Sequence, residues 1–324
     1  MIILTGAAGF IGTMVALALN EQGRDDLILV DAFTSAHKPL RCSKLKYAQL
    51  IDRENLNDWL DQHHDEVDQI IHLGARTDTT EFNWDIFLQL NLHYTQRLWN
   101  QCTQYNIPLI YASSAATYGA GELGYKDDHD LVAKLAPLNP YGRSKNEFDK
   151  WALDRVSYND FPPHWYGLKF FNVYGPFEYH KGRMASVVLH TYENVLKTGH
   201  MNLFRSHRPD FEDGMQLRDF VYVKDVASVI LFLCDQKPEN GLYNVGTGKA
   251  QSFLELAHAT FDSMEKPRDI SFIDIPEDIR DKYQYFTQAD ISKLRRAGYT
   301  KPFHNLSSGV HDYVTNYLNK HNFD

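Results

Sequence analysis

Residues 1–12 read Met1-Ile2-Ile3-Leu4-Thr5-Gly6-Ala7-Ala8-Gly9-Phe10-Ile11-Gly12, so three glycines directly follow an apolar run. Gly6 allows a tight turn, Gly9 lets the backbone approach a pyrophosphate, and Gly12 permits close packing of a helix on a strand. A lone glycine triplet also fits an ordinary strand-to-helix turn. Here, however, Asp31 ends the next apolar run, 19 residues after Gly12, where an acidic side chain can bind a ribose hydroxyl. The pattern therefore predicts a dinucleotide site at the first strand-to-helix turn.

Short apolar runs alternate with amphipathic stretches through the first half of the chain. This alternation indicates parallel βαβ units, and hence an α/β fold with a doubly wound parallel (Rossmann) sheet. The expected strands are 1–5, 27–31, 69–73, 109–113 and 165–170, and the expected helices are 11–23, 55–63, 84–105 and 141–155.

The second half is less regular, which predicts a smaller, discontinuous α/β domain for substrate binding. A strand at 220–223 and a helix at 226–234 are expected to return to the main sheet. The dinucleotide-binding domain would then comprise residues 1–171 and 218–247, and the substrate domain residues 172–217 and 248–324.

Composition excludes several classes of function. The net charge of −9 provides no overall basic field for nucleic acid or an anionic membrane. The three cysteines are far apart, which indicates neither a disulfide framework nor a metal site. No apolar stretch approaches the ~20 residues that span a bilayer. We expect a soluble, cytoplasmic protein that binds no nucleic acid, membrane or metal.

The charges near the end of the second strand leave the cofactor open. Asp31 by itself favours a free ribose 2′-hydroxyl, and therefore NAD. Lys38 and Arg53 follow it and would neutralise the 2′-phosphate of NADP, unless both are solvated surface charges.

A candidate catalytic group lies on the helix expected at 141–155. Tyr141 and Lys145 are four residues apart and so share one helix face. A lysine ammonium lowers the pKa of a nearby phenol, which makes it a usable base. Ser114 ends an expected strand and can hydrogen-bond a reacting hydroxyl. Tyr-x-x-x-Lys alone occurs by chance, but this serine raises its significance.

These motifs resemble those of the extended short-chain dehydrogenases/reductases over nearly the whole chain. Further matches are Phe-Asn-Val-Tyr-Gly-Pro at 171–176 and Arg-Asp-Phe-Val-Tyr-Val at 218–223. Within that superfamily, residues 75–81, 180–186 and 283–290 are most similar to the ADP-glycero-manno-heptose 6-epimerases. The Ser-Ala-Ala-Thr-Tyr-Gly run at 114–119 lacks the Thr-Asp-Glu of the 4,6-dehydratases.

The resemblance implies an isomerase that interconverts the two ADP-heptose epimers at C6″ for the inner core of lipopolysaccharide. Tightly bound NADP would take a hydride and return it to the other face of a transient aldehyde. Inversion then favours two proton-transfer groups, Tyr141 and Lys181. By its chemistry alone Lys181 is an ordinary solvated loop lysine, and only the resemblance assigns it this role.

The resemblance also assigns the remaining site residues. Arg218 presents a planar fork suited to diphosphate oxygens, although an ion pair with Asp219 is the rival interpretation. Arg183 stands where family members have a small polar residue, and Leu73 replaces an acidic one. The expected cofactor contacts are Gly6, Gly9, Phe10, Ile11, Gly12, Asp31, Ala32, Lys38, Arg53, Leu73, Gly74, Ala75, Arg76, Asn91, Lys145, Val173 and Lys181. The expected substrate contacts are Ser114, Asn172, Arg183, His190, Phe204, Arg218 and Tyr283.

Two other hypotheses stay open at this point. Ser114, Tyr141 and Lys145 serve equally well in a UDP-sugar 4-epimerase of the same fold. A cofactor-sensing scaffold without turnover is the third, and the intact reaction centre argues against it. The resemblance further implies a homo-oligomer of five or ten copies.

Overall fold

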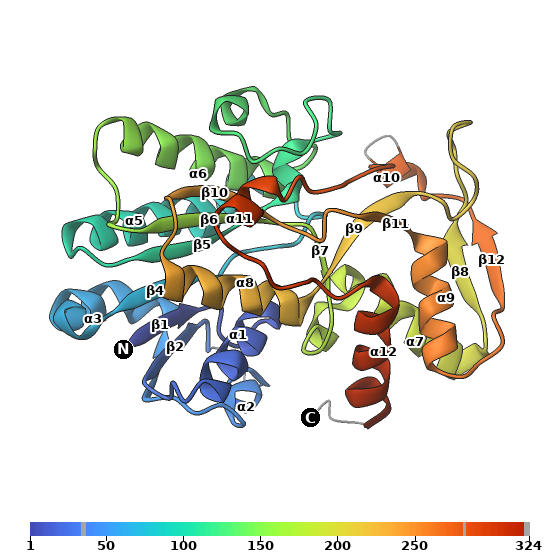
Figure 1. Ribbon diagram of the computed structural model, residues 1–324, viewed down its shortest axis with the longest axis horizontal. Coiled ribbons are helices and arrows are strands. Elements are labelled where there is room, and N and C mark those ends of the chain that lie inside the picture. Colours follow the sequence, from blue (N-terminus) through green and yellow to red (C-terminus); the bar gives the residue numbers. More distant parts are fainter. Residues whose placement is uncertain (34–36, 281–282, 321–324) are drawn as a thin grey trace. The chain divides into compact units, whose positions relative to one another are not determined.

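The structure, a computed structural model, describes residues 1–33, 37–280 and 283–320 (Figure 1). The chain divides into two compact units. The first comprises Met1–Phe170, Ala227–Asn244 and Ser292–Thr300, and the second comprises Phe171–Val226, Val245–Ile291 and Lys301–Asp324.

A seven-stranded sheet forms the centre of the first unit, in the order β10-β6-β5-β4-β1-β2-β3. β1 lies inside the sheet and pairs in parallel with both β2 and β4. The predicted α/β fold with a doubly wound parallel sheet is confirmed. The strands are β1 (Ile2–Thr5), β2 (Leu27–Asp31), β3 (Gln49–Asp52), β4 (Gln69–His72), β5 (Leu109–Ser114), β6 (Trp165–Phe170) and β10 (Gly241–Val245).

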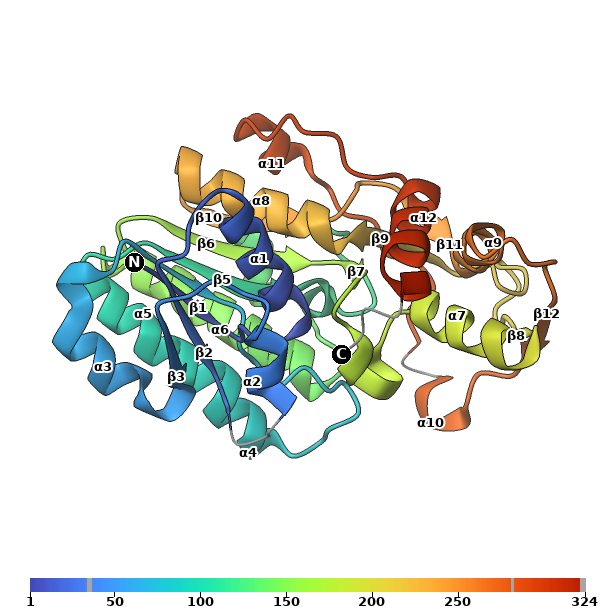
Figure 2. The ribbon, with the colours of Figure 1, turned by 90° about the horizontal axis from the view of Figure 1, so that it is seen from below.

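Helices cover both faces of this sheet (Figure 2). On one face, α3, α5 and α6 bury Leu60, Trp99 and Phe148 in a common core cluster with the strands. α1, α2 and α8 lie on the other face (Figure 2). The helices are α1 (Phe10–Glu21), α2 (His37–Cys42), α3 (Leu56–His63), α4 (Trp84–Phe87), α5 (Tyr94–Gln104), α6 (Pro140–Ser157), α8 (Val223–Gln236) and α11 (Ser292–Arg296). Short 3₁₀ turns occur at Arg53–Asn55, His64–Glu66, Ala115–Tyr118 and His129–Lys134.

The helix expected at 84–105 is interrupted. Between α4 and α5, residues Leu88–His93 form a π-helical turn. Asn91 lies in this turn, and its side chain exchanges hydrogen bonds of 2.8 and 2.9 Å with the backbone of Arg76. π-Turns are frequent at functional sites, and this one holds the loop after β4.

The prediction that a strand at 220–223 returns to the main sheet is wrong. That segment belongs to β9 (Leu217–Tyr222), which pairs with β7 (Asn172–Tyr174) and β11 (Ala250–Ser252) in a separate sheet of the second unit. β10 fills the edge of the main sheet instead. Apolar alternation identifies a strand but carries no information on its partner, because pairing is a long-range property.

The second unit also contains a two-stranded parallel sheet of β8 (Met201–Phe204) and β12 (Ile270–Ile273). Val195 of α7 and Phe261 of α9 pack on this sheet in a small core. The helices of this unit are α7 (Val187–Thr198), α9 (Phe253–Ser263), α10 (Glu277–Arg280) and α12 (Leu306–Asn316), with short turns at Tyr179–Met184 and Leu318–Lys320.

Candidate functional site

The glycine loop, residues 6–12, joins β1 to α1, and its three glycines leave no side chain over the backbone. A β-carbon on Gly6 would lie 2.7 Å from the Gly74 amide nitrogen, and one on Gly12 would lie 2.1 Å from the Gly6 carbonyl oxygen. Gly6 also has a φ of +68°, which glycine adopts readily. Gly9 precedes α1 without a side-chain cap, so Phe10, Ile11 and Gly12 begin the helix at an uncapped, electropositive end. The loop therefore fits a pyrophosphate.

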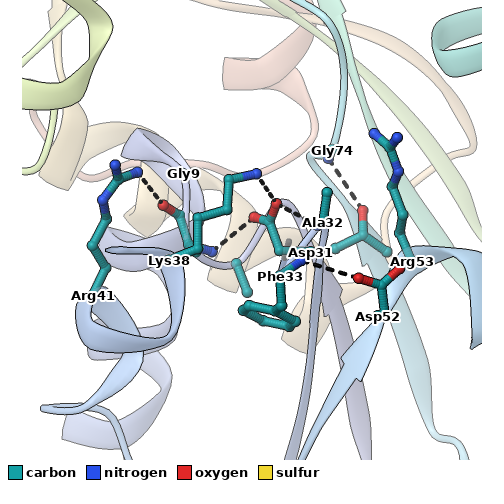
Figure 3. Close-up of polar contacts among 12 residues, drawn as sticks. Gly9, Asp31, Ala32, Phe33, Lys38, Arg41, Asp52, Arg53 and Gly74 are labelled. Carbon is teal, nitrogen blue, oxygen red and sulfur yellow. Dashed lines mark hydrogen bonds and ion pairs between the residues drawn. The ribbon is translucent and has the colours of Figure 1, made fainter. Parts of the chain in front are cut away.

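Asp31 ends β2 beside this loop (Figure 3). Its carboxylate accepts hydrogen bonds from the Ala8 amide at 3.0 Å and the Ala32 amide at 2.8 Å. The Lys38 ammonium forms an ion pair with it at 2.5 Å. The negative charge of Asp31 is thus balanced locally, which lowers the repulsion that a 2′-phosphate would meet.

Two arginines, Arg41 and Arg53, lie on either side of the Asp31–Lys38 ion pair, and their side chains have different partners (Figure 3). Arg53 forms an exposed ion pair with Glu54, at 2.8 Å. Arg41, which the sequence analysis missed, donates from Nη1 to the Ala8 carbonyl oxygen at 3.0 Å. Burial lowers the pKa of Arg41, while the charge of Asp31 opposes this shift. Its position three residues after Lys38 on α2 was the available signal.

The loop after β4 lies against the glycine loop. Gly74 donates its N–H to the Thr5 hydroxyl at 3.1 Å, and Leu73 donates to the Thr5 carbonyl oxygen at 3.1 Å. Ala75 and Arg76 continue this loop, with Arg76 bonded to Asn91 as described above. Five expected cofactor residues therefore lie at the carboxyl ends of β1 and β4, where α/β sheets bind ligands: Gly6, Leu73, Gly74, Ala75 and Arg76. A sixth, Asn91, is hydrogen-bonded to this loop through its side chain.

The expected reaction centre is assembled from β5 and α6. Asn139 caps α6 by accepting from the Gly142 amide at 2.8 Å, so Tyr141 and Lys145 both lie in its first turns. The Tyr141 phenol lies beside the side chain of Ser114 at the end of β5. Burial raises the pKa of Tyr141, and the Ser114 side chain lowers it. The structure thus brings all three residues together.

Lys145 is buried, and its ammonium donates to the Ala112 carbonyl oxygen at 2.7 Å. Burial lowers its pKa to about 8, although the carboxylate of Asp149 raises it. Near its ammonium, His72 is held between the hydroxyls of Thr5 and Thr95 at 2.6 and 3.0 Å. Burial and the charge of Lys145 lower the pKa of His72 to about 3, so this imidazole is neutral.

A buried ion pair that sequence reasoning missed lies one helical turn beyond Lys145. The Asp149 carboxylate and the Lys169 ammonium are 2.8 Å apart, with side chains 0% and 1% exposed. Asp149 also accepts from Tyr111 at 3.1 Å and Ser113 at 2.7 Å. Its i+4 spacing from Lys145 was visible in the sequence, but its partner on β6 was not.

In the second unit, Lys181 and Arg183 lie on the short turn Tyr179–Met184. Arg183 is exposed, whereas Lys181 is half-buried. Burial lowers the pKa of Lys181, and the neighbouring Glu178 raises it. Lys181 therefore does not behave as a fully solvated loop lysine.

Arg218 is buried on β9 between two rings, with its guanidinium 5.3 Å from the centre of Tyr283 and 5.5 Å from that of Phe253. Phe204 contacts the Tyr283 ring edge-to-face, at 6.0 Å. Asp219 faces the opposite side of the strand and accepts instead from Thr247, Gly248 and Ala289. The structure thus brings Phe204, Arg218 and Tyr283 together, as an aromatic and cationic cluster suited to a nucleotide.

The other predicted residues of this unit are more dispersed. Asn172 and Val173 lie on β7, whose residues pair with β9, and the Asn172 side chain is exposed. His190 is in the first turns of α7 and is half-buried.

Within residues 1–33, 37–280 and 283–320, no group of three or more His, Cys, Asp or Glu side chains is arranged to hold a metal ion. Over the same residues, no helix has the length and apolar character needed to cross a bilayer.

Comparisons with known proteins place the chain among nucleotide-sugar enzymes. The model of the NAD dependent epimerase/dehydratase family matches residues 2–246. An ADP-L-glycero-D-manno-heptose-6-epimerase of Fusobacterium nucleatum is 49% identical over 99% of this chain and 98% of its own length. One from Nitratidesulfovibrio vulgaris is 43% identical over 98% of each chain. The resemblance drawn from the motifs is confirmed.

Solved structures agree with this assignment. The crystal structure of the Helicobacter pylori ADP-L-glycero-D-manno-heptose-6-epimerase is 30% identical, with a TM-score of 0.77 over 97% of this chain and 94% of that one. The Thermus thermophilus UDP-glucose 4-epimerase, solved with NAD, has the same TM-score of 0.77 at 24% identity over 97% of each chain, and supports the fold alone.

Proposed function

Because this chain belongs to the NAD dependent epimerase/dehydratase family, and within it to the ADP-L-glycero-D-manno-heptose-6-epimerases, we propose that it interconverts ADP-D-glycero-D-manno-heptose and ADP-L-glycero-D-manno-heptose at C6″. The observation that carries the reaction is the position of Tyr141 beside the Ser114 side chain, which lowers the pKa of the phenol, with the buried Lys145 one turn further along α6. This is the arrangement that a phenolic acid/base needs: a neighbouring hydroxyl and a nearby cation. The product would supply the inner core of lipopolysaccharide.

We propose NADP as the resident cofactor. The glycine loop would hold its pyrophosphate, and Lys38, paired with Asp31, would offset the charge that otherwise disfavours a 2′-phosphate. Arg41 adds a second cation beside the loop. When bound, the nicotinamide would accept a hydride from C6″ and return it.

Tyr141 would act as the first proton-transfer group, receiving the proton of the C6″ hydroxyl. Lys145 stabilises the phenolate through its positive charge, and the Ser114 side chain lowers the pKa of the phenol. Inversion requires the C6″ oxygen in two positions, and we assign the second proton transfer to Lys181. Its lowered pKa favours that role, because an ordinary lysine is too weakly acidic to exchange a proton readily near neutral pH.

We further propose a division of labour in which residues 1–171 and 227–247 bind the dinucleotide, and residues 172–226 and 248–324 bind the nucleotide-sugar. Residues 218–226, expected from the sequence in the dinucleotide part, belong to the second part because β9 pairs within its sheet. Arg218, with Tyr283 and Phe204, would hold the diphosphate and the base. A cytoplasmic location and a homo-oligomer of five or ten copies complete the proposal.

The deciding experiment uses purified full-length protein without added cofactor. Incubation with ADP-D-glycero-D-manno-heptose, followed by proton NMR of the 6″ epimers, is expected to show conversion to a stable mixture of both. UDP-galactose, tested in parallel, is expected to remain unchanged. Conversion of UDP-galactose without conversion of the heptose would overturn the substrate assignment in favour of a 4-epimerase.

The cofactor proposal has its own test. Denaturing the purified protein and separating the released nucleotide by chromatography is expected to identify NADP. Lys38→Ala is expected to reduce the NADP content more than the NAD content, since the charge on Asp31 is then unbalanced. Release of NAD alone from the unaltered protein would overturn NADP.

A further inference from the structure

A buried carboxylate, that of Glu178, joins the two ends of the segment that contains Lys181. Glu178 is 0% exposed. One of its oxygens accepts from the Gly175 amide at 3.2 Å and from the Ser186 hydroxyl at 2.6 Å, and the other accepts from the Ser186 amide at 2.5 Å. One side chain therefore joins residue 175 to residue 186, across the whole segment that contains Lys181.

The backbone between these two anchors is not relaxed. Phe177 has a φ of +77°, in the left-handed region that residues with a β-carbon rarely adopt. Such a conformation persists only where surrounding contacts over-determine it. The Glu178 carboxylate, next in the chain and bonded on both sides of Phe177, supplies such contacts. Ser186 in turn caps α7 by accepting from the Leu189 amide at 3.4 Å, so the segment is anchored to a regular helix.

Lys181 is coupled to Glu178 through both backbone and charge. The Lys181 amide donates to the Glu178 carbonyl oxygen at 2.9 Å. The negative carboxylate opposes the effect of burial on the Lys181 ammonium. The other titratable groups facing Glu178 are Tyr179 and Tyr313 of α12, and burial together with the Glu178 charge raises the pKa of both phenols, which keeps them neutral. Glu178 thus acts on Lys181 through its charge. Burial raises the pKa of Glu178 itself, while the hydrogen bonds from Ser186 and Gly175 and the charge of Lys181 lower it.

We propose that Glu178 is a positioning residue for Lys181: its carboxylate ties Gly175 to Ser186, holds the intervening turn in one conformation, and supplies the negative charge beside the ammonium. This inference deepens the proposed function and rests on the role of Lys181 in it. Glu178 would act through Lys181, without contacting the substrate.

The test compares full-length, cofactor-loaded Glu178→Gln and Glu178→Ala with a matched control, Glu193→Ala. Glu193 is an exposed glutamate on α7, the helix that Ser186 caps. The first readout is amide hydrogen exchange of peptides covering 175–186, without substrate. Exchange there is expected to be at least about tenfold faster in both Glu178 variants, because the anchoring acceptor is altered or lost, and unchanged in the control.

The second readout is the pH dependence of epimerisation. Removing the carboxylate removes the charge that raises the Lys181 pKa, so the alkaline limb of the kcat profile is expected to move to lower pH in Glu178→Gln, by roughly half a unit or more. kcat is expected to fall about 10- to 100-fold in Glu178→Ala, since misplacing an acid/base group by about 1 Å costs that much. Glu178→Asp is expected to recover part of the activity.

Wild-type exchange at 175–186 and a wild-type pH profile in Glu178→Gln would together overturn the inference. If neither Glu178 variant folds, Ser186→Ala removes the hydroxyl that donates to Glu178 and also caps α7, so faster exchange is expected at 175–182, which lies outside the cap. Wild-type exchange in that variant would contradict the proposal that Glu178 holds Gly175 and Ser186 together. Failure of the unaltered protein to convert the heptose would refute the proposed function instead, while the exchange data would still decide whether Glu178 holds the segment.

Discussion

Neutralising Asp149 should be among the most damaging conservative changes in the first unit. Asp149→Asn keeps the shape of the side chain but removes its charge. The Lys169 side chain, which is 1% exposed, would then lose the carboxylate that now lies 2.8 Å from its ammonium. A neutral amide would take the place of that carboxylate. The bond of the ammonium to the Thr117 hydroxyl at 2.7 Å would persist, but a hydroxyl does not balance a charge. The variant thus leaves a buried, uncompensated ammonium.

The magnitude follows from that geometry. Removing one partner of a buried ion pair costs about 3–5 kcal/mol of unfolding free energy. At roughly 2.1 cal/mol/K of unfolding entropy per residue, a unit of about 200 residues would lose roughly 7–12 °C in Tm. Lys169→Met should cost a similar amount, because it leaves the carboxylate unpaired. The double variant should cost clearly less than the sum, since it removes both charges together.

The assay is equilibrium urea unfolding followed by circular dichroism, with cofactor at the same saturating concentration throughout. The control is Glu147→Gln on the same helix, which breaks the half-exposed Glu147–Lys150 pair of 3.2 Å and should cost less than about 1 kcal/mol. If Asp149→Asn costs no more than this control, or if the two single costs add fully in the double variant, the reasoning from a desolvated pair is refuted.

Three further outcomes are expected. Tyr141→Phe keeps the ring but removes the hydroxyl beside Ser114. NMR should therefore show epimerisation slowed by about 10²–10⁴-fold, with the bound cofactor retained. A smaller loss of rate would argue against Tyr141 as the acid/base. Gly12→Ala would place a β-carbon 2.1 Å from the Gly6 carbonyl oxygen, so the protein should lose its cofactor on gel filtration. A β-carbon on Gly23 would have no atom within 4 Å, so Gly23→Ala should keep the cofactor. Equal cofactor content in both variants would contradict the close packing at Gly12. Burial lowers the pKa of His72 from 6.5 to about 3. Between these pH values the unfolded chain binds a proton at His72 that the folded chain does not. The free energy of unfolding should therefore fall as the pH drops from 6.5 to about 3, by up to about 1.4 kcal/mol per pH unit. His72→Asn should flatten this slope in urea titrations at several pH values, and an unchanged slope would show that other groups dominate.

Short-range patterns in the sequence predicted five strands of the main sheet (β1, β2, β4, β5 and β6) and the candidate reaction centre, but not β3 or β10. The glycine loop, the apolar runs and the spacing of Tyr141 and Lys145 are all local, and local spacing specifies which side chains share a turn or a helix face. Ser114 could be joined to them because it ends a strand at the same edge of a parallel sheet. The family resemblance extended this to the second unit, where Arg218 and Tyr283 indeed lie together.

Only the tertiary structure decided which distant groups meet. The Asp149–Lys169 pair, the approach of Arg41 to the glycine loop and the closure of residue 175 onto 186 by Glu178 each depend on the direction in which a side chain leaves its element. The sheet to which β9 belongs and the π-turn at Asn91 depend likewise on long-range pairing. A buried charge is stable only beside a partner, and that partner is found by folding in three dimensions, so its identity is not written in the neighbouring sequence.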